Sequence, residues 1–343
     1  MTNSRSSALP YKLLRAWRRK LGCNQGFTLI ELLVSLVISG IVVSGLLFIV
    51  VELLRTDQRE VALDQVQSDM QRAIDYMADD LKEAIYVYSN PAVVTSQLVN
   101  LNAEIAANNA VPVLAFWRTD TIDADDIAAL PTGAGADGCP PTDATCSVIK
   151  ARRASYTLVA YYQRPQYGAW EGESTLKRYE LAQYNDLTAT GAAQYAETAG
   201  FSLPFDSTGQ TNDFANWSPE NPDDPADPGT GGDGGDRTVL VDYLDSIRNT
   251  TNDAPNPVVN CQEFTGDPAH VLAPSTATEN TGFFACIRPT TAVGGFRTNQ
   301  DVFLFLRGDA TASSQFLQPA SENSRLPTLQ TQVKLGGVVD RDG

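Results

Sequence analysis

Histidine is nearly absent from this chain, which has only His270 among its 343 residues. A Ser-His-Asp or Cys-His arrangement needs an imidazole beside its nucleophile, and one histidine leaves little to complete a metal site. No Gly-rich segment followed by Lys is present to cradle a phosphate. A glycosidase needs only paired carboxylates, whose placement depends on the fold. These absences predict a protein that is not an enzyme.

Acidic residues are missing from residues 1–26, where six Lys or Arg residues give a charge of +6. Because the whole chain carries −16, the rest of it carries −22. A body this acidic repels phosphate backbones, so we expect no nucleic acid among its partners.

All charge is missing from residues 32–51, LLVSLVISGIVVSGLLFIVV. At about 1.5 Å per residue, these twenty residues cover about 30 Å, the thickness of a hydrocarbon core. The basic flank precedes this span, so the positive-inside rule leaves residues 1–26 in the cytoplasm and exports the chain after Glu52. The sequence therefore predicts a single-pass membrane protein whose C-terminal domain is exported.

Two features separate this segment from a secretory signal, which has similar hydropathy. A secretory cleavage site follows the apolar region, whereas Gly26 precedes it. Glu31 also places one carboxylate at the cytoplasmic end of the apolar stretch. A charged residue costs about 2.5–3.5 kcal/mol at the bilayer centre on insertion scales, and less near the edge, so Glu31 needs a partner.

Residues 26–34, GFTLIELLV, resemble the class III signal of type IV prepilins and type II secretion pseudopilins. The resemblance implies that a membrane aspartyl peptidase cuts between Gly26 and Phe27, removing residues 1–26 as a basic leader. It also implies that the same enzyme methylates the new amine of Phe27. Glu31 would be the fifth mature residue, which in this family pairs with the amino terminus of a neighbouring subunit. An uncleaved signal anchor is the alternative.

The same resemblance implies an inner-membrane anchor, with the C-terminal domain in the periplasm or in an extracellular filament. It also names the partners that we expect. They are the prepilin peptidase and methyltransferase, other pilins or pseudopilins contacted through the amino-terminal helix, the inner-membrane assembly platform, and the membrane itself. An isolated carboxylate and an isolated ammonium are both costly in lipid, so pairing them across a subunit boundary relieves both and fixes their axial register.

Proline is absent between Pro10 and Pro91, so nothing forces a break in a helix over residues 27–89. We expect residues 27–54 to be its transmembrane half and residues 55–90 its amphipathic half. In the second half, apolar residues recur at intervals of three and four, which indicates a helix packed on one side. This stripe consists of Val66, Met70, Ile74, Met77, Leu81 and Ile85.

Residues 91–343 predict an exported, β-rich domain. Six segments rich in β-branched and aromatic residues are expected strands. They are Val113–Arg118, Tyr156–Gln163, Leu176–Leu181, Val239–Leu244, Val302–Arg307 and Leu329–Leu335. An antiparallel sheet packed on the apolar face of the helix is the economical arrangement, so we expect an α+β fold with long loops.

Four cysteines follow the leader, an even number that suits an oxidising compartment. Sequence neighbours suggest Cys139 with Cys146 and Cys261 with Cys286, one of three possible pairings. The first pair would tie a loop over residues 123–147.

The segment 218–236, SPENPDDPADPGTGGDGGD, contains five Asp and one Glu among Pro and Gly. Oxygen ligands on a Gly-rich backbone suit calcium, although the spacing does not fit an EF-hand. A disordered acidic loop has the same composition, so no cofactor is expected beyond this weak calcium site. Its candidate ligands are Asp223, Asp224, Asp227, Asp233 and Asp236.

The region QRAIDYMADDLKEA, residues 71–84, resembles the larger minor pilins, including the J-type pseudopilin of type II secretion. Residues 27–88 also resemble the pseudopilins of hormogonium polysaccharide secretion in filamentous cyanobacteria. A bulky, acidic exported body with long loops is poorly suited to a repeating shaft, which favours a minor subunit. A tip adhesin or calcium-binding minor pilin is the first alternative, and a membrane-anchored enzyme is the second.

Overall fold

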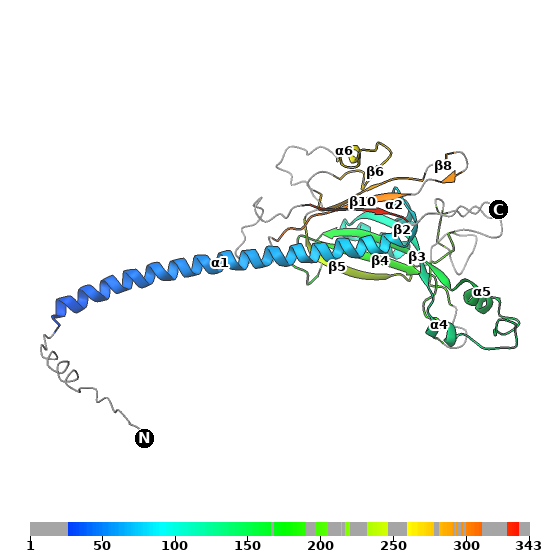
Figure 1. The fold of residues 1–343 in the computed structure, drawn as a ribbon, viewed down its shortest axis with the longest axis horizontal. Helices are drawn as coiled ribbons and strands as arrows, with labels where there is room; N and C mark the ends of the chain where they lie inside the picture. The colour runs from blue at the N-terminus through cyan, green and yellow to red at the C-terminus, as the bar shows by residue number, and fades with distance from the viewer. Residues whose placement is uncertain are drawn as a thin grey trace, which may run out of the picture. The chain divides into compact units, whose positions relative to one another are not determined.

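The computed structural model describes residues 27–165, 168–189, 196–204, 214, 217–219, 232–245, 259–277, 281–290, 292–293, 296–297, 300–310 and 328–335. The chain divides into two units, with the boundary between Asp57 and Gln58. Helix α1 (Leu29–Lys82) supplies the described part of the first unit and continues into the second (Figure 1). The second unit adds antiparallel sheets and short helices, so the chain has the expected α+β class.

The larger sheet of the second unit has five antiparallel strands, which pair in their chain order. Its strands are β1 (Ala84–Val87), β2 (Val111–Thr121), β3 (Ala154–Pro165), β4 (Ser174–Ala182) and β5 (Asp236–Leu244). The central strand β3 buries both of its faces, since Val159 and Tyr161 belong to one core cluster and Leu158 and Tyr162 to another. Successive side chains of a strand point to opposite faces, so this sheet needs a cover on each side.

The smaller sheet has four antiparallel strands in the order β11-β10-β7-β6. These are β6 (Val271–Ala273), β7 (Phe283–Ile287), β10 (Asp301–Leu306) and β11 (Leu329–Lys334). The disulfide Cys261–Cys286 joins α6 (Cys261–Thr265) to β7. A separate two-stranded ribbon pairs β8 (Ala292–Val293) with β9 (Phe296–Arg297).

The main core joins the second half of α1 to both sheets, and Figure 1 shows this half of the helix running along the five-stranded sheet. The predicted stripe is confirmed from Val66 to Leu81, because all five of its residues in that range are buried. Met77 and Leu81 are fully buried in the core cluster that also contains Tyr161 of β3 and Leu304 of β10. Full burial of one such apolar side chain stabilises the fold by about 1.5–3 kcal/mol.

The opposite face of the five-stranded sheet is covered by α2 (Pro91–Thr95), α3 (Val99–Asn108) and aromatic side chains that include Trp217. Helix α3 lacks a local side-chain cap, and Asp233 takes this role from 132 residues away. The carboxylate of Asp233 accepts hydrogen bonds from the backbone N–H groups of Asn100 and Leu101, which lie in the first turn. A carboxylate here satisfies orphan donors and complements the helix dipole.

The predicted C-terminal end of the long helix is wrong, because α1 ends at Lys82 rather than near residue 89. Ala84–Val87 instead form strand β1, which pairs with β2. Ile85, expected on the helical stripe, therefore lies in a strand and packs against the second core cluster. A strand explains the β-branched and aromatic content of this segment better than a helix does.

The six predicted strands are all confirmed as β2, β3, β4, β5, β10 and β11. The sequence prediction missed β1, β6, β7, the ribbon of β8 and β9, and the short helices. The expected loop over residues 123–147 contains α4 (Ala124–Ala129) and the start of α5 (Ala144–Arg152). Asp123 and Asp143 cap these two helices by accepting hydrogen bonds from backbone N–H groups in their first turns. Cys139–Cys146 ties the segment between them.

Glu104 of α3 is the centre of a polar cluster on the face of the five-stranded sheet that α2 and α3 cover. Lys177, Arg164 and Arg237 all pair with its carboxylate. Burial alone would raise its pKa, but the hydrogen bond and charge of Lys177, with smaller effects of Tyr162 and Arg164, lower the pKa below its ordinary value of 4.5. A carboxyl whose pKa is lower in the folded chain stabilises the fold above its unfolded pKa. That stabilisation is lost as the pH falls through the folded pKa.

Replacing Glu104 with Gln should therefore destabilise the chain at pH 7 more than at pH 3. The free energy of urea-induced unfolding, measured at both pH values for the parent and the variant, checks this. The matched control is Glu263→Gln, which changes an exposed carboxylate of α6. An effect of Glu104→Gln that does not vary with pH would contradict the assigned role of the charge.

Candidate assembly site

Helix α1 begins within the predicted processing signal. Gly26 lies outside the described residues, whereas Phe27 and Thr28 directly precede the helix, which starts at Leu29. The backbone N–H of Glu31 donates to the Thr28 hydroxyl at 3.3 Å and to the Thr28 carbonyl at 3.0 Å. Thr28-x-x-Glu31 is thus the spacing of a capping box, a signal that the sequence prediction missed.

Two features of its surroundings distinguish Glu31. It is the acidic residue of the first turn of α1, where the helix dipole favours a negative charge. It also lies in a shallow hollow of 350 Å³ on one helix face, together with Val34, Ser35 and Ile38. The carboxylate is therefore placed beside the segment where cleavage after Gly26 would create an ammonium group.

The helix surface of the first unit has no protein cover within that unit. Every residue from Phe27 to Gln58 is exposed, including large apolar side chains such as Leu29, Phe48 and Leu53. Among the described residues, α1 is the one helix that is long and apolar enough to cross a membrane. Backbone groups of a helix are satisfied internally, which suits this surface to lipid or to other apolar helices.

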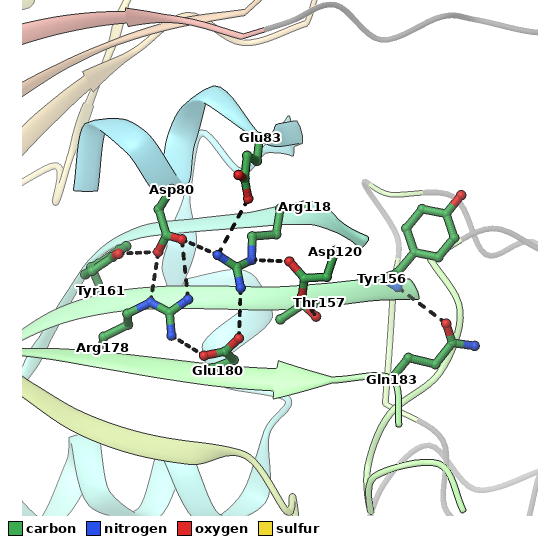
Figure 2. Close-up of polar contacts among 10 residues, drawn as sticks. All are labelled: Asp80, Glu83, Arg118, Asp120, Tyr156, Thr157, Tyr161, Arg178, Glu180 and Gln183. Atoms are coloured by element: carbon green, nitrogen blue, oxygen red, sulfur yellow. Dashed lines mark hydrogen bonds and ion pairs between the residues drawn. The ribbon is translucent and has the colours of Figure 1, made fainter. Parts of the chain in front are cut away.

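Near the other end of α1, the carboxylate of Asp80 is buried. Asp80 lies three residues after Met77 and two residues before the end of the helix at Lys82, and 4% of its side chain is exposed. Its carboxylate accepts hydrogen bonds from Arg118 of β2, Tyr161 of β3 and Arg178 of β4, as Figure 2 shows. The Arg178 Nε–Asp80 Oδ2 distance is 2.8 Å. Three neighbouring strands thus hold one helical side chain.

The two guanidinium groups have further partners on the sheet. Glu180 pairs with both, including Arg118 Nη2 at 3.0 Å, and Asp120 lies 2.9 Å from Arg118 Nε (Figure 2). Burial lowers the pKa of Arg178, but hydrogen bonds to Asp80 and Glu180 raise it overall, so this group stays charged. Burial and then the charge of Asp80 raise the pKa of Tyr161, so its phenol remains a donor.

This arrangement resolves an electrostatic conflict. A carboxylate in the last turn of a helix faces the negative end of the helix dipole, and burial adds a desolvation cost. Asp80 meets both conditions, and two cations and a phenol compensate for them. Because the partners sit on fixed strands, the helix can slide or rotate only by leaving buried charges unpaired.

The two candidate calcium ligands that the structure describes, Asp233 and Asp236, have different surroundings. Asp223, Asp224 and Asp227 lie outside the described residues. Asp233 is buried as the cap of α3, and it also accepts from the Tyr179 hydroxyl and pairs with Arg237. Asp236 is exposed at the start of β5. In the described residues, the one acidic group close enough to hold a metal comprises Glu173, Asp245 and Asp309, and Arg307 pairs with Asp245 at 2.6 Å.

The remaining predicted residues have plain structural positions. The disulfides Cys139–Cys146 and Cys261–Cys286 have the pairing suggested by sequence neighbours. His270 is buried, with its Nε2 atom 3.4 Å from Asp301 and its ring against Phe303.

Residues 22–47 match the prokaryotic N-terminal methylation motif. The chain carries a prepilin-type signal. This match includes the predicted cleavage site and Glu31, and it supports a type IV pilin-like, processed subunit with a single membrane anchor. Comparisons with curated proteins and with solved structures gave no match.

Replacing Asp80 with Asn should destabilise the second unit by about 3–5 kcal/mol, because the buried guanidinium groups lose a charged partner. The neighbouring Asp79→Asn is the matched control, since the Asp79 side chain is 74% exposed and pairs only with Lys82 among the ion pairs described. Its effect should stay within about 0.5 kcal/mol. Urea unfolding of the detergent-solubilised chain, followed by tryptophan fluorescence, measures both. Equal losses for the two variants would contradict the anchoring role.

Proposed function

We propose that this protein is a minor pilin or pseudopilin, a structural subunit of a type IV pilus-like or type II secretion-like filament. In this proposal, prepilin peptidase cuts the chain between Gly26 and Phe27 and methylates the Phe27 amine. The first half of α1 then anchors the subunit in the inner membrane and later packs among the corresponding helices of other subunits. The second unit lies in the periplasm or in the extracellular filament and serves polysaccharide or protein secretion or motility.

The observation that carries this proposal is the combination of a methylation motif with an uncovered apolar helix that begins at the motif. Glu31 is the one ionisable residue between Phe27 and Val51. In lipid it gains most from a neighbouring subunit's terminal ammonium, because little water competes for either charge. Pairing them at each subunit boundary would set the axial register of the filament.

The minor-subunit assignment depends on the second unit. Its many acidic residues would repel identical copies stacked side by side. The resemblance of residues 71–84 to J-type pseudopilins supports the same assignment, and that of residues 27–88 supports polysaccharide secretion. The calcium-binding alternative loses one ligand in the folded chain, because the Asp233 carboxylate already accepts from four donors.

Mass spectrometry of the chain purified from its native membrane tests the processing step. We expect N-methylated phenylalanine, Phe27, as the first residue. In cells that lack prepilin peptidase, the same chain should retain residues 1–26. A native, working protein that retains this leader would exclude a processed subunit and favour an uncleaved anchor.

Replacing Glu31 with Gln tests the assembly step, because it keeps the shape of the side chain and removes its charge. Cleavage should persist, whereas incorporation into sheared filaments should fall at least about tenfold, the factor that corresponds to about 1.4 kcal/mol. Glu52→Gln, at the other end of the apolar run, is the matched control and should assemble normally. Quantitative immunoblots of filament and membrane fractions measure the ratio. Normal incorporation of Glu31→Gln would refute the charge pair.

A further inference from the structure

A cavity of 630 Å³ opens on the second unit, lined by the amphipathic half of α1, the residues that precede β4, and the edge strand β5. Sites for small molecules and side chains commonly have volumes of about 300–1,000 Å³. The cavity lies outside the methylation motif, and its lining includes neither Asp80 nor the three residues that hold Asp80. Binding at this cavity therefore does not depend on the proposed function.

Three aromatic residues line this cavity: Tyr76 from α1, Trp170 from the segment before β4, and Tyr243 from β5. Trp170 is 41% exposed and Tyr76 is 47% exposed. Large aromatic side chains left open at a concave site offer contact area at a low cost in conformational entropy. The guanidinium of Arg178 already lies 5.8 Å from the centre of the Tyr76 ring, so one aromatic wall interacts with a cation in the isolated chain.

The segment that carries Trp170 is held to β5 by hydrogen bonds from its backbone N–H groups to a side chain of β5. The carboxylate of Asp242 accepts hydrogen bonds from the N–H groups of Glu171 at 3.0 Å and Gly172 at 3.1 Å. A Cβ atom on Gly172 would lie 2.3 Å from the Tyr243 nitrogen, so only glycine permits this close approach. A site held in this way loses little conformational freedom when a ligand binds.

The charges at the cavity favour a cationic ligand. Its lining includes the carboxylates of Asp69, Glu171 and Asp242 and the guanidinium of Arg72, which gives a formal charge of −2. Arg72 pairs with Asp69 at 3.7 Å, so the negative excess lies on the side of Glu171 and Asp242. Burial, and then the charges of Asp242 and Glu171, raise the pKa of the Tyr243 phenol, as a negative potential at this wall requires.

We propose that this cavity binds an arginine or lysine side chain of a peptide segment, which stacks on Trp170 and pairs with Glu171. A cation over the face of an aromatic ring is attracted by the ring's quadrupole, and the attraction strengthens where water is excluded. A carboxylate beside the ring adds a charge-assisted hydrogen bond, which a neutral ligand cannot match.

Fluorine NMR of the full-length chain in detergent micelles, labelled with 5-fluorotryptophan, tests the proposal. Trp170→Phe identifies the Trp170 resonance. Titration with the blocked tripeptide acetyl-Gly-Arg-Gly-amide should shift that resonance saturably, and the lysine peptide should do the same. The citrulline peptide has nearly the same shape without the charge, and it should bind at least about fivefold more weakly.

Glu171→Gln keeps the backbone N–H that Asp242 accepts, so the loop should stay in place while affinity for the arginine peptide falls about fivefold or more. Glu263→Gln, an exposed carboxylate outside the cavity, should bind like the parent. An unshifted Trp170 resonance at millimolar peptide, or equal binding of the citrulline peptide, would overturn the proposal. A shift produced instead by a neutral oligosaccharide such as maltohexaose would also overturn it, in favour of a sugar site.

Discussion

The structure of the second unit depends on one buried carboxylate, that of Asp80, and on the three strands that hold it. Apolar contacts between α1 and the sheets provide much of the stabilisation, but they are tolerant of small shifts. A carboxylate that must meet Arg118, Tyr161 and Arg178 at once is not tolerant, because a shifted helix leaves charges buried without partners. The apolar stripe therefore brings helix and sheet together, and Asp80 selects the position and rotation at which they meet.

Helix α1 presents the same electrostatic problem twice, with two different solutions. Asp80 lies near its end and finds its cations within the chain. Glu31 lies in its first turn, where the helix dipole favours a negative charge and the Thr28 hydroxyl accepts from the Glu31 backbone N–H. In the proposed assembly, the missing partner is the ammonium of another subunit. One carboxylate thus sets the register within the chain, and in the proposed assembly the other would set the register between chains.

The sequence predicted those features that depend on neighbouring residues. The apolar run, the stripe from Val66 to Leu81 and the six main strands follow from local periodicity and β-branched content, and the structure confirms them. Two local signals were present but missed: the capping-box spacing of Thr28 and Glu31, and the position of Asp80 three residues after buried Met77. A carboxylate on the buried face of a helix indicates a partner elsewhere in the chain.

The identity of such partners could not be predicted from the sequence, because they are distant in it. Tyr161 and Arg178 follow Asp80 by 81 and 98 residues. Asp233 lies in a segment whose composition suggested calcium, yet its carboxylate caps a helix 132 residues earlier in the chain. The early end of α1 has a related cause, since pairing with β2 outweighs the helical spacing of Ile85. Composition indicates what a residue can bind, whereas the fold determines which of the possible partners lies next to it.

The proposed cleavage gives the assembly step an order in time. Before it, the nitrogen of Phe27 belongs to a neutral peptide bond, so Glu31 has no terminal ammonium to pair with in any copy of the chain. The proposed cleavage would remove a leader of charge +6 and leave a single cation at the start of an apolar helix. N-methylation of an amine retains its positive charge, as it does for lysine. The cut would therefore create the charge on which assembly depends, and an unprocessed chain would stay anchored in the membrane without a way to register against its neighbours.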